Sequence, residues 1–205
     1  MSIKNLEINE DWLYHQVDAI KLGKIIKSGG LKARRLLSKE DKRKSENGVW
    51  NGRHFISFAK KAEGEDTAYD HYMSGEFALI FDPDIGAIKT KVKEVGSIFE
   101  TIAKLPTNKR FSRWKEEYQV KNFVPFDKVV GIKIPSGKRF WNVYEDDAIY
   151  QKKQLEGMLQ TLDENNLDVP FIDVEEGKIV PKEEMEDYLD NKVKQEQQES
   201  NRKGK

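Results

Sequence analysis

The chain contains no cysteine and only 3 histidines in 205 residues. The absence of cysteine excludes disulfide bonds and cysteine nucleophiles, and it fits a protein of the reducing cytosol. A catalytic zinc site is not expected, because such sites take several histidine or cysteine ligands. No apolar run approaches the ~20 residues that a membrane-spanning helix needs, and the opening residues MSIKNLEINEDW lack the apolar core of a signal peptide. We therefore expect a cytoplasmic protein with no membrane partner and no metal.

Glycine-rich phosphate-binding motifs are also missing. Neither a G-x-G-x-x-G pattern nor a P-loop occurs in the chain, which excludes Rossmann-type dinucleotide binding and P-loop nucleotide hydrolysis. Asp82 and Asp84 belong to a D-P-D-I-G sequence that is typical of a turn. No second carboxylate cluster stands at a spacing that would suit magnesium.

The composition is polar but sufficient for a compact core. Hydrophobic residues make up 37% and charged residues 35%, with ten Phe and four Trp. Charge is uneven, because residues 1–61 hold 14 Lys and Arg against 7 Asp and Glu, whereas residues 145–205 hold 9 against 17. A basic segment of this kind attracts anions such as a dinucleotide or a nucleic acid. Two solvated faces of opposite charge are the alternative interpretation.

Hydrophobic periodicity near the N-terminus predicts a strand followed by a helix. The strand covers residues 13–15. Asp18 can cap the helix, since its carboxylate can accept hydrogen bonds from the first free N–H groups. Gly29 and Gly30 can end it, because they allow positive φ.

The rest of the chain predicts further short strands and helices, including a helix or loop around residues 67–74 and a helical stretch near residues 97–104. In the R-H-F-I-S-F sequence, His54, Ile56 and Phe58 face one way, whereas Phe55 and Ser57 face the other. Pro125 interrupts strand pairing between two late strands. The predicted elements are strands over residues 53–58, 76–81, 117–120 and 128–134, a helix over 147–165, a strand pair around 176–177, a charged helix over 182–198 and a disordered tail over 195–205.

Three pieces of this pattern could meet around one ligand. They are Tyr14-His15 at the end of the first strand, the face of Phe55 and Ser57, and Glu117 at the start of a late strand. A histidine can donate to ribose hydroxyls, and an aromatic ring can stack on a flat heterocycle. A carboxylate can bind a ribose 2′-hydroxyl and stabilise positive charge at the anomeric carbon. This set suits cleavage of an N-glycosidic bond through an oxocarbenium-like transition state.

The order of these motifs resembles the ADP-ribosyltransferase fold over residues 12–135. The motifs are the Tyr-His strand, the helix ending K-S-G-G-L, the H-F-I-S-F strand and the stretch E-Y-Q-V-K-N-F-V-P-F-D-K-V-V-G-I-K-I-P. The chain is similar in particular to bacterial DNA-targeting ADP-ribosyltransferase toxins and related proteins. The resemblance implies an α+β fold with a split, mixed or antiparallel sheet flanked by helices and a helical C-terminal appendage. We divide the chain into such a domain over residues 1–145, a helix-and-strand extension packed on it over 146–181, and a charged helix with a disordered tail over 182–205.

The same resemblance implies an enzyme that uses NAD as its substrate, with Glu117 as the catalytic carboxylate. His15 would hold the nicotinamide-side ribose, and Tyr69 or Tyr72 would stack on the nicotinamide. Arginines would meet the pyrophosphate, since guanidinium pairs well with phosphate oxygens. The implied NAD-binding residues are His15, Tyr14, Ser57, Phe55, Tyr72, Arg34 and Arg53, with Arg35 as an alternative to the other arginines.

The sequence departs from the family pattern in two ways. It has one serine in F-I-S-F where a Ser-Thr-Ser triplet is common, and Lys115 stands two residues before Glu117 in place of Gln or Glu. An Arg or Asn acceptor is therefore not favoured. If the strand register differs by one residue, Glu116 becomes the catalytic candidate, because neighbouring residues point to opposite faces.

The acceptor of ADP-ribose is expected to be a macromolecule, DNA, RNA or protein, and a toxin or effector role would add an antitoxin or inhibitor protein as partner. A rival hypothesis from another class is a nucleic-acid or protein binding module without catalysis, in which Trp50 and Trp114 could stack on bases of a nucleic acid. A third is an RNA 2′-phosphotransferase-like enzyme, which would rely on Arg34, Arg35 and Arg53 rather than on Glu117.

Overall fold

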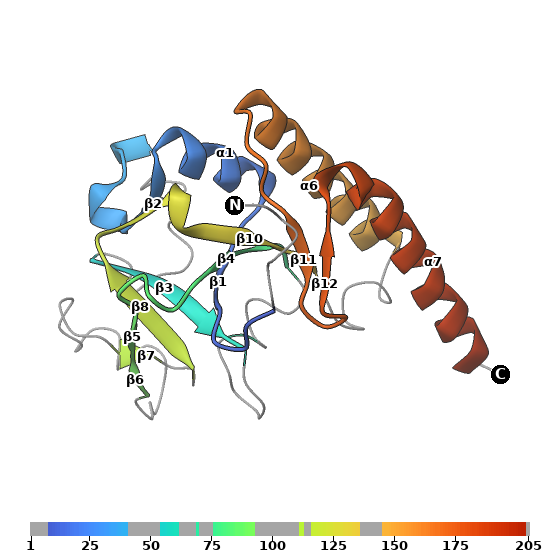
Figure 1. Cartoon of the computed structure of the whole chain (residues 1–205), viewed down its shortest axis with the longest axis horizontal. Coiled ribbons are helices and arrows are strands. Elements are labelled where there is room, and N and C mark those ends of the chain that lie inside the picture. Colours follow the sequence, from blue (N-terminus) through green and yellow to red (C-terminus); the bar gives the residue numbers. More distant parts are fainter. Residues whose placement is uncertain are drawn as a thin grey trace.

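The computed structural model describes residues 8–40, 54–61, 69, 76–92, 111–112, 116–135 and 145–203 (Figure 1). Over these ranges the protein is a mixed α+β fold with a mostly antiparallel sheet of eight strands. The strands of this sheet are β1 (Leu13–Gln16), β3 (Phe55–Lys60), β4 (Ala78–Phe81), β5 (Ile88–Lys89), β8 (Glu117–Lys121), β10 (Val129–Lys133), β11 (Phe171–Asp173) and β12 (Lys178–Val180).

Among the described residues, the strand order of the eight-stranded sheet is β12-β11-β10-β4-β1-β3-β8-β5, and within this sheet only the β10–β11 contact is parallel. The α+β class expected from the sequence is thus observed. Two small two-stranded sheets accompany the large one. They consist of β2 (Gly30–Lys32) with β9 (Phe123–Pro125), and of β6 (Lys91–Val92) with β7 (Phe111–Ser112).

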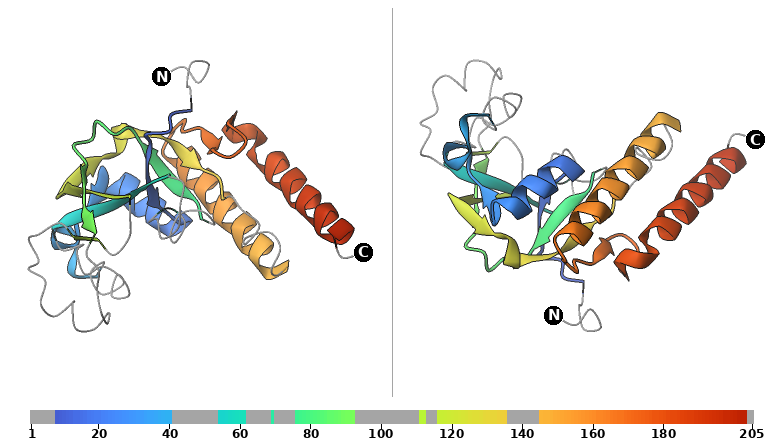
Figure 2. Two further views of the ribbon diagram at one scale, coloured as in Figure 1. Left: turned by 90° about the horizontal axis from the view of Figure 1, so that it is seen from below. Right: turned by 90° about the horizontal axis from the view of Figure 1, so that it is seen from above.

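Three α-helices and three short 3₁₀ turns complete the described chain. In Figures 1 and 2, α6 lies between α1 and α7, and α7 lies at the end of the sheet away from β5 and β8. No helix in the described ranges is long and apolar enough to cross a membrane. The helices are α1 (Ala19–Lys27), α6 (Glu145–Glu164) and α7 (Met185–Lys203), and the turns are η2 (Arg34–Leu36), η3 (Phe126–Lys128) and η4 (Lys182–Glu184).

The boundaries of α1 follow the predicted chemistry. The Asp18 carboxylate accepts from the Lys21 N–H at 2.7 Å, as expected for an N-cap. At the other end Gly29 has φ +76° and Gly30 has φ +153°, so both predicted stop residues adopt backbone angles that favour glycine. The chain then turns directly into β2.

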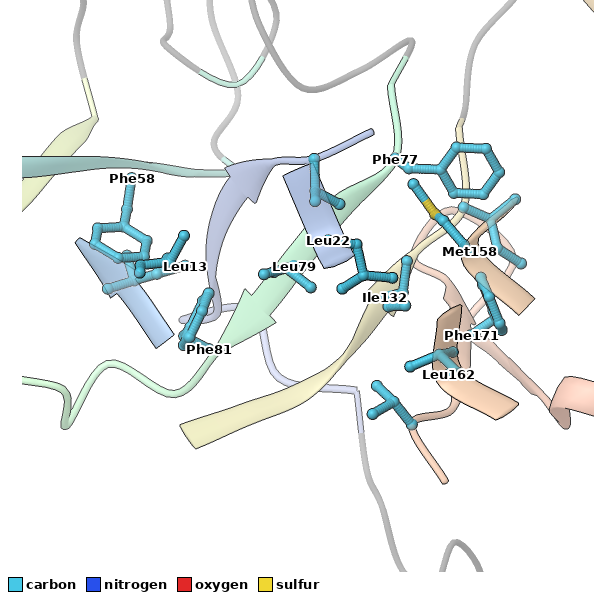
Figure 3. Close-up of a cluster of buried hydrophobic side chains, with 14 of the residues drawn as sticks. Leu13, Leu22, Phe58, Phe77, Leu79, Phe81, Ile132, Met158, Leu162 and Phe171 are labelled. Carbon is cyan, nitrogen blue, oxygen red and sulfur yellow. The ribbon is translucent and has the colours of Figure 1, made fainter. Parts of the chain in front are cut away.

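One face of the sheet packs against the helices. Leu13 and Phe58 from the strands, Leu22 of α1, and Met158 and Leu162 of α6 belong to one buried cluster (Figure 3). These side chains are at most 1% exposed. Their burial gives α1 and α6 fixed positions over β1, β4 and β10, since apolar area removed from water stabilises the fold in proportion to its size.

The C-terminal segments share this sheet and core. β11 and β12 extend the sheet beyond β10, and Met185 and Leu189 of α7 are buried in the same cluster. Residues 195–203, for which the sequence predicted disorder, are helical in the structure. That prediction was wrong because the stretch, though polar, contains good helix formers and no glycine before Gly204, so helix propensity favours continuation.

Another difference concerns Pro125. The sequence predicted only an interruption there, whereas residues 123–125 form β9, which pairs antiparallel with β2. Proline can occupy an edge position of such a short ladder, because no partner needs its missing N–H.

Candidate functional site

Three polar side chains meet where β3 lies beside β8. Ser57 pairs with Gln119, and Ala59 pairs with Glu117. Residues paired across an antiparallel ladder point to the same face, so Ser57, Gln119 and Glu117 share one face of the sheet. Gln119 Nε2 donates to Glu117 Oε1 at 3.1 Å and lies 3.5 Å from Ser57 Oγ. Ser57 and Glu117, which the sequence predicted to contact one ligand, are therefore linked by Gln119.

The main chain of Glu117 is fixed by the residue that follows β5. Thr90 lies next to β5 and donates to the Glu117 carbonyl oxygen twice, from its N–H at 2.9 Å and from its hydroxyl at 2.9 Å. Thr90 is buried, whereas Glu117 is half-buried. The backbone is thus held firmly while the carboxylate side chain stays partly accessible.

Glu116 has a different environment from Glu117. It adopts φ +53° immediately before β8, an angle uncommon for residues other than glycine. Its carboxylate pairs with Lys89 and accepts from the Tyr118 hydroxyl at 3.3 Å. Of the two adjacent glutamates, only Glu117 contacts Gln119 among the described hydrogen bonds. This placement favours Glu117 over the alternative register.

His15 contacts the same strand through the backbone. Its Nδ1 lies 2.8 Å from the Ser57 carbonyl oxygen, and its ring lies 5.6 Å from the ring of Phe58. Burial lowers the pKa of His15, and the Ser57 hydrogen bond opposes this shift only in part. A carbonyl oxygen can only accept, so the neutral ring carries its proton on Nδ1 and offers Nε2 as an acceptor.

The ladder between β1 and β3 ends just before His15. The two strands pair only at Leu13 with Lys60 and at Tyr14 with Ala59. Beyond Tyr14 the imidazole of His15, rather than a backbone N–H, contacts the Ser57 carbonyl. Side-chain alternation places His15 on the helix-covered face and Glu117 on the opposite face. The structure thus brings both to β3 around Ser57, but from opposite faces of the sheet.

Two tyrosines lie on the face that carries Glu117. Tyr14 is 2% exposed and Tyr69 is 3% exposed, and their rings meet edge to face with centroids 5.0 Å apart. Burial raises the pKa of Tyr14 above its ordinary value. Tyr14 was predicted to bind NAD, and in the structure its ring packs against Tyr69.

A buried lysine completes this tyrosine cluster. Lys133 Nζ lies 5.7 Å from the centre of the Tyr69 ring and donates to the carbonyl oxygens of Glu76 at 3.1 Å and Ile134 at 3.0 Å. Burial lowers the pKa of Lys133 to about 7. The sequence gave no reason to select Lys133, because it stands in a strand that was assigned only a structural role.

Phe55 and Arg34 lie at the other end of β8. Phe55 is buried and pairs with Lys121, and the N–H of Ala33 beside Arg34 donates to the Asn122 carbonyl oxygen at 2.7 Å. Lys121 stands four positions after Glu117 on β8, which corresponds to ~13 Å. These two predicted residues are therefore not adjacent to Glu117. Arg35 lies nearby and donates to the Asn122 side chain at 2.6 Å.

Several predicted residues lie outside the described part of the chain. They include Tyr72 and Arg53 of the implied NAD site and both tryptophans of the rival hypothesis, Trp50 and Trp114.

Gln119 is the site residue that sequence reasoning missed. Strand alternation gives residues two apart the same face, so E-Y-Q already placed Gln119 beside Glu117. A buried glutamine is uncommon enough to be informative, but its burial becomes visible only when the neighbouring strands are known.

The arrangement can therefore support ligand chemistry at β3. A carboxylate oriented by an amide can stabilise positive charge that develops on a nearby ligand. A neutral imidazole with Nε2 as an acceptor can receive a hydroxyl proton in a hydrogen bond. Within the described residues, no group of three or more potential metal ligands is found. No family model, curated protein or solved structure matches this chain.

Proposed function

We propose that the protein is an NAD-dependent ADP-ribosyltransferase with an ADP-ribosyltransferase-like split sheet. The observation that carries the proposal is the set of contacts around Ser57. The Ser57 carbonyl oxygen accepts a hydrogen bond from His15 Nδ1. The Ser57 hydroxyl lies beside Gln119, whose amide donates to Glu117. The β1–β3 ladder ends at this point, and the proposal requires the ligand to enter where these two strands separate, because His15 and Glu117 lie on opposite faces of the sheet.

The proposed reaction cleaves the bond between ribose C1′ and the nicotinamide nitrogen of NAD. The bonding electron pair leaves with nicotinamide, and C1′ becomes positively charged. Glu117 accepts a hydrogen bond from the ribose 2′-hydroxyl and stabilises this charge electrostatically. An acceptor nucleophile then forms a bond to C1′ and releases its proton to solvent water.

His15 has a modified role in this scheme. The sequence led us to expect a hydrogen-bond donor to ribose. Since its Nδ1–H donates to the Ser57 carbonyl oxygen, the neutral ring would accept a hydrogen bond from a ribose hydroxyl at Nε2.

The acceptor is proposed to be a nucleic acid or a protein. Lys24 and Lys27 occupy the last turn of α1, and Arg35 is exposed on η2. Positive charge near this end of the molecule favours the approach of a polyanion. A toxin or effector role with an inhibitor protein would follow from such an activity.

Release of nicotinamide from radiolabelled NAD tests the function, with DNA, RNA and protein supplied in turn as acceptors. We expect Glu117→Gln to reduce the rate about 100-fold or more, the usual effect of losing one electrostatic contact in a transition state. Glu116→Gln is the matched control, because it changes the adjacent carboxylate that pairs with Lys89. Equal rates for wild type and Glu117→Gln would remove Glu117 from the mechanism.

Wild-type protein that releases no nicotinamide with any acceptor would refute the transferase proposal. Salt-sensitive binding to a nucleic acid in the same samples would then support the non-catalytic binding module.

A further inference from the structure

We propose that Gln119 is a positioning residue that orients the Glu117 carboxylate for the reaction. This inference rests on the proposed function and assigns a role to a residue that the family resemblance did not single out. Gln119 stands in the middle of β8, two residues after Glu117, with its side chain on the same face.

The direction of the hydrogen bond defines what Gln119 does. A carboxylate oxygen can only accept, so the amide nitrogen of Gln119 faces Glu117 Oε1, 3.1 Å away. The same nitrogen lies 3.5 Å from Ser57 Oγ. One amide group thus links the candidate catalytic carboxylate to β3, the strand whose Ser57 carbonyl contacts His15. Loss of the amide would remove this link between the Glu117 carboxylate and β3.

The other half of the amide shows that Gln119 is poorly suited to a purely structural role. Gln119 is 0% exposed, and within the described chain its Oε1 has no hydrogen-bond donor. A buried polar atom without a partner destabilises the folded state. An apolar side chain of similar length would avoid this cost, so the fold alone would favour methionine at this position.

The chain offers a matched control in Gln151 of α6. It is also 0% exposed, and neither its Oε1 nor its Nε2 has a hydrogen-bond partner in the part of the chain that the structure describes. Gln151 lies on a helix and makes no described contact with Glu117. Replacing either glutamine by methionine removes a buried polar group, but only one replacement removes a donor to Glu117.

The two roles predict opposite combinations of stability and activity. We compare wild type, Gln119→Met and Gln151→Met by urea unfolding and by steady-state release of nicotinamide from NAD. We expect both variants to unfold at the same or a higher urea concentration than wild type. We expect Gln119→Met to lower kcat about tenfold or more, since small misplacements of a reacting group are costly, with KM within about threefold. Gln151→Met keeps the wild-type kcat.

The outcomes separate this inference from the proposed function. A Gln119→Met protein that is as active as wild type overturns the positioning role while leaving the transferase intact. A variant that loses stability and activity together, with matching losses in Gln119→Leu, shows a structural role and also overturns the inference. If wild type itself releases no nicotinamide, the function fails, and the positioning role fails with it.

Discussion

The double glycine at the end of α1 allows a quantitative test of the fold. Gly29 and Gly30 are neighbours with positive φ, but their surroundings differ. A Cβ added to Gly29 would meet nothing within 4 Å, whereas a Cβ on Gly30 would lie 2.2 Å from the Val124 carbonyl oxygen. Gly30 is buried in β2 opposite Pro125 of β9. An alanine at Gly30 must therefore push two backbone strands apart.

The expected losses in unfolding free energy follow from these differences. Gly29→Ala should cost about 1–2 kcal/mol, the strain of a left-handed conformation with a Cβ. Gly30→Ala combines backbone strain of about 1–3 kcal/mol with overpacking of about 1–3 kcal/mol, or about 2–6 kcal/mol together. The entropy lost by the unfolded chain is the same in both variants and cancels in their comparison.

Urea unfolding followed by circular dichroism measures both variants against wild type, and thermal unfolding gives a second value. For a chain of this size each kcal/mol corresponds to about 2–4 °C in Tm, so the Gly30→Ala protein should melt well below the Gly29→Ala protein. If Gly30→Ala costs no more than Gly29→Ala, β2 and β9 are not in close contact, and the described end of α1 is wrong.

Two further predictions concern buried charges. Burial lowers the pKa of Lys133 to about 7, below the ~10.4 of a lysine in an unfolded chain. Between these two pH values, the unfolded chain binds a proton that the folded chain lacks. The free energy of unfolding therefore rises with pH over this range. Linkage gives a rise of about 2 kcal/mol in the free energy of unfolding from pH 7 to pH 9, and Lys133→Met should abolish this rise. Urea unfolding of both proteins at each pH measures it. A stability difference between wild type and Lys133→Met that stays constant with pH would contradict the prediction. Lys192→Met should cost about 3 kcal/mol because it leaves the Asp173 carboxylate, which is 1% exposed, without its ion-pair partner. Lys152→Met breaks only an exposed pair between α6 and Asp190 of α7 and should cost less than about 1 kcal/mol. Equal losses in these two variants, measured by the same unfolding assay, would refute the importance of the buried pair.

Local chemistry was sufficient to predict the parts of the fold that depend on neighbouring residues. Asp18 and Gly29 act through N–H groups and φ angles within one turn, so their roles could be inferred from the sequence. The pairing of β9 with β2 could not, because it joins residues about ninety positions apart and leaves no periodic signal. The helix at residues 195–203 was missed because polarity was given more weight than helix propensity.

The candidate site was predictable to a similar degree. Alternation along β3 correctly placed Ser57 opposite to Phe58. The predicted late strand began at Glu117, as β8 does, while Glu116 stayed open as the catalytic candidate of the alternative register. It could not reveal that Ser57 and Glu117 are bridged by Gln119, since that depends on the register between β3 and β8. The contact of His15 with a backbone carbonyl was equally hidden, because it requires the separation of β1 from β3.

The parallel contact between β10 and β11 restricts how the protein can be shortened. The N–H groups of Ile132 and Ile134 donate to the carbonyl oxygens of Pro170 and Ile172 at 2.8 and 2.9 Å. A fragment that stops before residue 145 would leave this row of donors uncovered along a strand in the middle of the sheet, and bare strand edges recruit other chains. Recombinant fragments made for crystallisation or screening should therefore extend at least to Val180, because shorter ones would aggregate.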